Sequence, residues 1–190
     1  MKYIHTPKAA FFGILLLFLV TSCSKEYDTE TFDSSSLVTV KIQGTQSAFS
    51  QVNIDVLEVQ FRVLEDETDP NAWITLHTIN TGIHDFTSIT DNDVVTLVDF
   101  DEVPSEYIYS IKLVFGDQNS AVKNGLEYLL DMSPENENGC QNIVGKQLIS
   151  NTLYEFVIEL DLNNSIELST DGNAKLDPKM NTVLRRFDLF

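Results

Sequence analysis

Residues 154–162 read Tyr-Glu-Phe-Val-Ile-Glu-Leu-Asp-Leu, and this stretch decides the fold class. Every even-numbered side chain in it is apolar, whereas the odd-numbered ones are mostly acidic. Successive side chains of a β-strand point to opposite faces of the sheet. The stretch is therefore predicted to be a strand with one buried apolar face and one solvated acidic face.

The same period of two recurs along the rest of the chain. Residues 38–42 alternate between aliphatic and polar side chains, and residues 107–115 place Tyr107, Tyr109, Ile111, Leu113 and Phe115 on one predicted core face. Residues 94–100 are mostly apolar, which predicts a more deeply buried strand. Further strands are predicted at residues 73–79, 165–168 and 183–189.

One predicted strand, at residues 52–63, contains a shift in its pattern. Apolar residues take even positions from Val52 to Val56 and odd positions from Leu57 to Val63. A shift of one residue turns every following side chain to the other face of a sheet. A β-bulge near Val56 and Leu57 would restore a single core face, so we predict one there.

Polar turn segments separate these strands, and no segment of twelve residues after the N-terminal region has the period of a helix. The turns lie at residues 66–71, 116–119, 133–139 and 171–173. Many short strands with frequent turns are typical of β-sandwiches. We therefore expect an all-β fold, a single Greek-key β-sandwich of about eight strands behind a flexible N-terminal tether.

The N-terminus has the pattern of a bacterial lipoprotein signal. Lys2 and Lys8 precede an uncharged apolar run at residues 9–20, which is shorter than the roughly 20 residues that a membrane-spanning helix needs. The run ends in Val20-Thr21-Ser22-Cys23, which resembles the lipobox that precedes a lipid-modified cysteine. The alternative is an ordinary signal peptide that happens to end near a cysteine.

The lipobox divides the chain into three parts. These are a signal peptide at residues 1–22, a lipid-anchored flexible tether at 23–36 and the β-sandwich domain at 37–190. By analogy with better-known lipoproteins, Ser24 after the anchor points to the outer membrane, and Lys25 with Glu26 loosely resembles surface-export tags. We expect a lipid-anchored protein of the cell outer membrane, facing the periplasm or the cell surface.

The composition excludes several kinds of partner. The chain of 190 residues has 12 basic and 29 acidic side chains, and its net charge is −17. Nucleic acids and anionic lipid surfaces are bound through clustered Lys and Arg, so neither is expected, and membrane contact is expected only through the lipid. With Cys23 lipidated, Cys140 has no partner for a disulfide and is expected to be a small buried apolar residue.

Short motifs along the chain carry a family resemblance. In order, they are Val52–Val59, Trp73-Ile74-Thr75-Leu76, His84-Asp85-Phe86, Pro104 followed by Ile111-Lys112-Leu113, Leu160-Asp161-Leu162 with Ser165-Ile166, and Pro178 with Val183-Leu184-Arg185. In this order they resemble the bacterial lipoprotein family called domain of unknown function 4382. The resemblance implies a β-sandwich in the cell envelope and brings no established activity or catalytic residue.

Signatures of catalysis and metal binding are sparse. The chain has no Gly-x-Ser-x-Gly and no His-Glu-x-x-His motif, so we expect no enzyme and no cofactor. The best candidate calcium ligands are four acids that flank one strand, Asp91, Asp93, Asp99 and Asp101. The competing interpretation of these residues is that they belong to solvated loops of a very acidic protein.

Trp73 is the one aromatic residue that we single out as a ligand contact, because it opens a strand beside an acidic loop. Tyr107, Tyr109 and Tyr154 lie on apolar faces and are expected to pack in the core. Taken together, these patterns favour a non-enzymatic lipoprotein that binds a protein, a glycan or another envelope component. The alternatives are a hydrolase with an unrecognised acidic site and a structural surface subunit that assembles through a strand edge.

Overall fold

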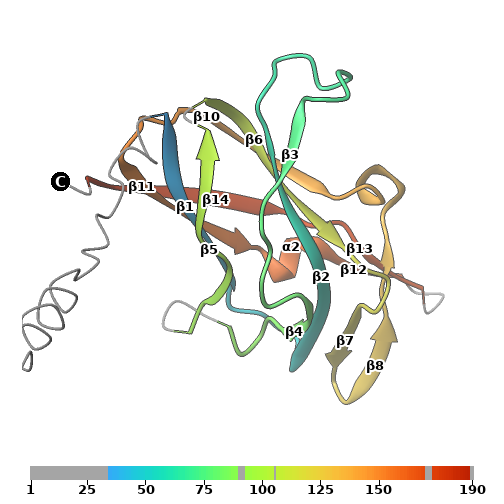
Figure 1. Cartoon of the computed structure of the whole chain (residues 1–190). Helices are drawn as coiled ribbons and strands as arrows, with labels where there is room; N and C mark the ends of the chain where they lie inside the picture. Colours follow the sequence, from blue (N-terminus) through green and yellow to red (C-terminus); the bar gives the residue numbers. More distant parts are fainter. Residues whose placement is uncertain (1–33, 90–92, 105, 170–172, 189–190) are drawn as a thin grey trace, which may run out of the picture. The chain divides into compact units, whose positions relative to one another are not determined.

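The computed structural model describes residues 34–89, 93–104, 106–169 and 173–188, which are arranged as shown in Figure 1. This part of the chain holds fourteen β-strands, one short helix, α2 (Leu162–Ser165), and one 3-10 turn, η2 (Pro134–Asn136). The all-β prediction is confirmed. The strands outnumber the eight expected because several contain only two to four residues. No helix of the described residues is long and apolar enough to cross a membrane.

Sheet A has four strands with β1 in its interior. Their order is β14 (Met180–Asp188), β11 (Thr152–Leu160), β1 (Ser35–Gly44) and β5 (Val95–Pro104). β1 runs parallel to β11, whereas the other two pairs are antiparallel. β1 begins at Ser35, two residues inside the segment predicted as the tether.

Sheet B is built around the long strand β2, and other strands pair with both edges of β2. Its path is β10 (Cys140–Gln147), β6 (Tyr107–Phe115), β2 (Gln51–Arg62), β7 (Ser120–Lys123) and β8 (Leu126–Leu129), with β3 (Trp73–Thr75) and β4 (Gly82–Asp85) also paired to β2. The strand predicted at residues 73–79 is thus shorter than expected. A small third sheet joins β12 (Ile166–Leu168), β13 (Ala174–Leu176) and β9 (Asp131–Met132).

Sheets A and B share one apolar core. The rings of Phe156 on β11 and Phe61 on β2 have centroids 5.0 Å apart, and both side chains are fully buried. The predicted core face of the stretch that decides the fold is confirmed, since all its members are buried: Tyr154, Phe156, Ile158, Leu160 and Leu162. Alternation in that one stretch therefore identifies the side of sheet A that faces sheet B.

The predicted β-bulge in β2 is also present. The register of β2 against β6 shifts between Val56 and Glu58, so that Leu57 is the extra residue. Val56 and Val59 are both fully buried, whereas Leu57 is 47% exposed. The bulge keeps both halves of the strand facing the core and pushes one leucine to the surface.

The prediction that Tyr107 and Tyr109 pack in the core is wrong. Tyr107 is exposed and Tyr109 is half-buried, whereas Ile108 between them is fully buried. The alternation of β6 changes phase at Ser110 and Ile111, which are both buried. At the same level the pairing of β10 with β6 is irregular, so the first three residues of β6 turn the opposite side chains outward.

β5 buries less of its apolar run than the sequence predicts. Leu97 and Val98 are fully buried, but Phe100 is 56% exposed. Phe100 has a φ of 50°, a backbone conformation that breaks the alternation of a strand. β5 is the edge strand of sheet A, and its register against β1 shifts twice, so this irregular edge departs from the expected pattern.

Glu155 lies on the face of β11 predicted to be acidic and solvated, yet it is only 9% exposed. Lys41 on β1 binds one of its carboxylate oxygens, and Arg185 Nη1 on β14 lies 3.1 Å from the other. The hydrogen bond from Lys41 is the largest of the effects that lower the pKa of Glu155. The acidic face is therefore a cross-strand ion cluster at this point.

Replacing Glu155 with glutamine is expected to lower the free energy of unfolding at neutral pH by about 1 kcal/mol. A carboxyl group whose folded pKa is lowered stabilises the fold above its unfolded pKa of about 4.3, and this contribution is lost as the pH falls through the folded pKa. Urea unfolding of both proteins should thus show a difference at pH 7 that shrinks on acidification.

The matched control for this prediction is Glu159→Gln on the same strand. Glu159 is bound by the amides of Gln43 and Asn181 rather than by cations, so this variant should lose less stability at neutral pH. A Glu155→Gln difference that stays constant down to pH 3 would contradict the role given to the charge of Glu155.

Candidate functional site

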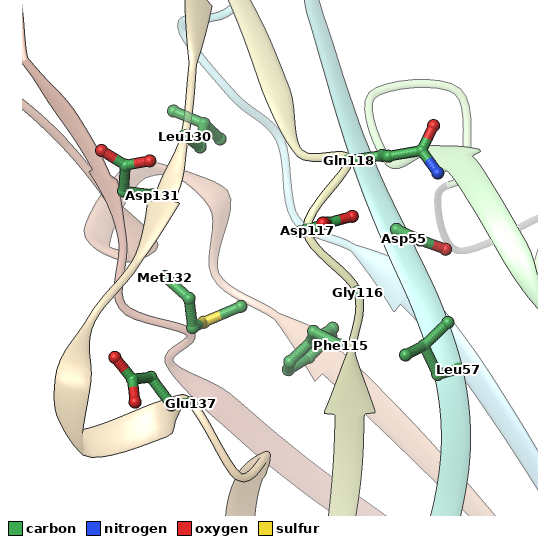
Figure 2. A pocket seen from close by; sticks show the side chains of 10 residues that line it. All are labelled: Asp55, Leu57, Phe115, Gly116, Asp117, Gln118, Leu130, Asp131, Met132 and Glu137. Carbon is green, nitrogen blue, oxygen red and sulfur yellow. The ribbon is translucent and has the colours of Figure 1, made fainter.

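A surface cavity of about 590 Å³ lies beside the bulge of β2, at the end of β6. It is lined by Asp55, Leu57, Phe115, Gly116, Asp117, Gln118, Leu130, Asp131, Met132 and Glu137. Figure 2 shows Asp131, Met132 and Glu137 on one side of the cavity and Asp55 and Leu57 on the other. Segments far apart in the sequence therefore meet at this one place.

Asn119 holds the walls of the cavity together and is itself almost fully buried. Its side-chain oxygen accepts a hydrogen bond of 2.9 Å from the backbone N–H of Asp55, and its side-chain amide donates one of 2.7 Å to the carbonyl of Gly116. Its own carbonyl accepts a hydrogen bond from the N–H of Leu130. One asparagine thus fixes β2, the turn after β6 and the segment before β9 relative to one another.

Gly116 lies directly against the side chain of Asp55. A Cβ atom added at Gly116 would be 2.0 Å from Asp55 Oδ2 and 2.6 Å from Asp55 Cγ. The backbone N–H of Gly116 also donates a hydrogen bond of 2.8 Å to the carbonyl of Asp55. Only a residue without a side chain lets the turn approach the carboxylate this closely, so Gly116 determines where the carboxylate of Asp55 lies.

The cavity is acidic and has no internal counterion. Asp117, Asp131 and Glu137 are exposed at its rim, and none of the described residues that line it is Lys, Arg or His. Asp55 is only 6% exposed, and within the described part of the chain no group donates a hydrogen bond to its carboxylate or forms an ion pair with it. Neither oxygen of Asp55 is among the buried side-chain atoms that lack a partner, so the carboxylate keeps access to solvent through the cavity that it lines. Its charge is therefore open to a ligand that enters the cavity, which marks Asp55 as the chemically significant residue of the site.

Apolar side chains make up the rest of the cavity wall. Leu57 is half-exposed through the bulge, Met132 is partly exposed, and Phe115 and Leu130 are buried beneath the surface. A ligand with an aliphatic stem and a positively charged end would satisfy both parts of this lining, because long basic side chains combine those two properties.

Three of the four acids predicted as calcium ligands, Asp93, Asp99 and Asp101, belong to the described residues, and these three are not grouped around a metal-sized space. No group of three or more His, Cys, Asp or Glu side chains in the described segments is placed to hold a metal ion. Asp93 and Asp99 are exposed, and Asp101 Oδ2 accepts a hydrogen bond of 2.7 Å from the backbone N–H of His77. Asp91 lies outside the described residues.

The other residues that the sequence analysis singled out lie away from the cavity lining. Trp73 is half-buried on β3, where Lys112 Nζ lies 3.9 Å from the centre of its ring. Cys140 is buried, and its thiol donates a hydrogen bond of 3.2 Å to the carbonyl of Pro178. Burial raises the pKa of Cys140 to about 11, so the thiol stays protonated at neutral pH. Cys23 lies outside the described residues.

The acids of the cavity were not predicted from the sequence. Asp55, Asp117, Asp131 and Glu137 come from four separate segments, and their convergence depends on how the strands pair. Two local features of the sequence predicted the backbone around the cavity but not its acidic lining. They were the expected bulge near Leu57 and the expected turn at residues 116–119.

Comparison with known proteins gives a family but no activity. No curated protein and no solved structure shows a significant match to the chain. The family model described as a domain of unknown function (DUF4382) matches residues 35–178, from the first residue of β1 to Pro178, just before β14. The match therefore includes every segment that lines the cavity, and the chain belongs to the DUF4382 family.

Proposed function

We propose that this protein is a non-enzymatic binding module that a lipid on Cys23 anchors to the outer membrane or cell surface. The support for the anchor is the sequence Val20-Thr21-Ser22-Cys23 after an apolar run of signal-peptide length. Cys23→Ala is expected to abolish labelling with radioactive palmitate and to move the protein from the membrane fraction to the soluble fraction. Continued labelling of this variant would reject the anchor.

The binding site that we propose is the acidic cavity, and its ligand is the side chain of a lysine or arginine from a partner protein. The observation that carries this proposal is the carboxylate of Asp55, which lines the cavity and has no hydrogen-bond or ion-pair partner among the described residues. A charged group that enters the cavity would form a charge-assisted hydrogen bond with this carboxylate. The aliphatic stem of the same side chain would lie against Leu57 and Met132.

The test is an NMR titration of the full chain with short glycine peptides that carry one central lysine, arginine or norleucine. The basic peptides should shift the amide signals of Gly116 and Asp117 and of residues 130–132 in a saturable way. The norleucine peptide has a similar stem without the charge and should shift them far less. In Asp55→Asn the dissociation constant of the basic peptides should rise about tenfold or more, since hydrogen bonds to charged groups contribute about 1.5–3 kcal/mol.

The same variant should be more stable than the natural protein. Asp55→Asn replaces one carboxylate of an acidic cavity with a neutral amide of similar shape and so removes its repulsion from the other three acids of the lining. The free energy of unfolding is therefore expected to rise by about 0.5–1 kcal/mol. Loss of binding together with a gain in stability is the signature of a residue kept for function. A purely structural carboxylate would instead lose stability when it is replaced.

Glu106→Gln is the matched control for both measurements. Glu106 is exposed and precedes β6, whereas the cavity lies beyond the other end of that strand. The control removes the same charge and should change neither peptide binding nor stability by a measurable amount. Equal weakening in Asp55→Asn and Glu106→Gln would show that the peptides respond only to the net charge of the chain, and would reject the cavity.

A further inference from the structure

The face of sheet B that points away from the core carries two adjacent rows of paired side chains. Phe61 and Ile111 are buried in the core, so Gln60 and Arg62 on β2 and Lys112 on β6 lie on the opposite face. One row of paired residues runs across four strands as Ile143, Ser110, Arg62 and Trp73, and Ser110 in this row is buried. The next row runs as Gln141, Lys112, Gln60 and Thr75. We call the seven residues other than the buried Ser110, together with Tyr109, the aromatic face.

Two cations of the aromatic face lie over aromatic rings. Lys112 Nζ is 3.9 Å from the centre of the Trp73 ring, and the guanidinium carbon of Arg62 is 5.5 Å from the centre of the Tyr109 ring. Tyr109 in turn packs edge-on against Tyr107, with their ring centroids 4.7 Å apart. The face therefore combines flat apolar surfaces with positive charge, in a protein whose net charge is −17.

Neither cation is fully matched by the protein. No carboxylate of the described residues lies within ion-pair distance of Lys112 Nζ. The nearby Glu58 is instead held by hydrogen bonds from Gln60 and Thr75. Arg62 Nη1 is 3.3 Å from Glu67 Oε2, but Arg62 Nε is buried and has no hydrogen-bond partner in the described part of the chain. Loss of hydration lowers the pKa of Lys112, and this effect outweighs the opposing attraction of the nearby Glu58.

The surroundings of the aromatic face leave it open to solvent. Ile143, at one end of the first row, is 84% exposed, and Gln141 and Thr75 are exposed in the second row. Trp73 and Lys112 are half-buried, and the side chain of Arg62 is 17% exposed. The exposed side chains and the accessible parts of Trp73 and Lys112 are therefore available to a ligand that is itself broad and flat.

We propose that the aromatic face binds an acidic oligosaccharide, with a sugar ring against Trp73 and the sugar carboxylate paired with Lys112 or Arg62. The apolar C–H groups on one side of a sugar ring suit an aromatic surface, and the planar amides of Gln60 and Gln141 can bind hydroxyl groups. The guanidinium of Arg62 offers the forked geometry that a carboxylate prefers. This site has the opposite charge to the acidic cavity and does not depend on it.

Trp73 makes the proposal directly measurable because it is the single tryptophan of the chain. The full-length protein is titrated with hexamers of galacturonate, glucuronate and mannuronate, and with neutral hexamers of glucose and galactose. At least one acidic hexamer should change the tryptophan fluorescence in a saturable way, and the neutral ones should not. The dissociation constant should rise with ionic strength, because salt screens contacts between exposed charges.

Lys112→Gln is expected to weaken binding about tenfold, as for loss of a charge-assisted hydrogen bond. Trp73→Ala, followed by calorimetry because it removes the fluorophore, should weaken binding by a similar factor. The matched control is Lys123→Gln, since Lys123 also lies over an aromatic ring, 5.0 Å from the centre of Phe49, but on β7. This control should leave binding unchanged.

Several results would overturn the proposal. Absence of a response to all three acidic hexamers would reject an acidic glycan as the ligand. Equal binding of neutral hexamers would reject the role of Lys112 and Arg62. An equal fluorescence change with acetate at the same carboxylate concentration would show that only a simple anion binds near Trp73. Equal weakening in Lys112→Gln and Lys123→Gln would show that net charge, not this face, governs binding.

Discussion

Replacing Phe156 with alanine is expected to lower the free energy of unfolding by about 3–5 kcal/mol. Phe156 is fully buried on β11, and its ring meets that of Phe61 across the space between sheets A and B. Removal of the ring leaves a cavity that the rigid sheets on both sides cannot close. Urea unfolding followed by circular dichroism gives the change, with the slope of the transition as a check that unfolding stays two-state.

Phe187→Ala is the matched control, because it removes the same ring from β14 in the same sheet. Phe187 is 47% exposed, so its loss should cost about 1 kcal/mol or less. If the two variants lose stability equally, the ring of Phe156 does not lie between two packed sheets. The contrast between the variants therefore measures the packing of the two layers rather than the general value of a phenylalanine.

Gly116→Ala is expected to cost about 2–3 kcal/mol by overpacking. The new Cβ would lie 2.0 Å from Asp55 Oδ2 and 2.6 Å from Asp55 Cγ. Rotation of the carboxylate does not relieve the second contact, and the side chain is too enclosed to swing away freely, since Asp55 is only 6% exposed. Thermal and urea unfolding of the variant give the size of the effect.

A double-mutant cycle identifies the cause of that loss. Asp55→Ala removes the two clashing atoms, so the combination Asp55→Ala with Gly116→Ala should recover most of the stability, with a coupling of about 2 kcal/mol. Strict additivity of the two changes would mean that Gly116 and Asp55 do not share this space. It would also remove the reason for placing the carboxylate of Asp55 at a fixed point in the cavity wall.

Strand periodicity predicted the parts of the fold that depend on neighbours in the sequence. The alternation at residues 154–162 identified β11 and its buried face, and the pattern shift at Val56 and Leu57 identified the bulge. Both features follow from side chains that must reach a single core. They are visible in the sequence because each one involves a single strand.

Features that depend on pairing between strands were missed. Tyr107 and Tyr109 turn outward because β6 changes phase where its pairing with β10 is irregular, and nothing within β6 reveals this. The alternation of β11 alone predicts that Glu155 is solvated. Its ion-pair partners, Lys41 and Arg185, come from the strands on either side and cannot be inferred from β11. The acidic cavity is the extreme case, because its four acids belong to four segments and its key residue, Asp55, looks like any polar position of an alternating strand.

The position of β1 has a mechanical consequence. β1 is the first described strand of the chain, and it is bonded to β11 on one side and to β5 on the other. A pull on its N-terminal end acts along the strand and loads both ladders of hydrogen bonds in shear. An edge strand under the same load could peel away one bond at a time. Under tension from the N-terminal side, β1 therefore leaves sheet A only when many backbone hydrogen bonds break together.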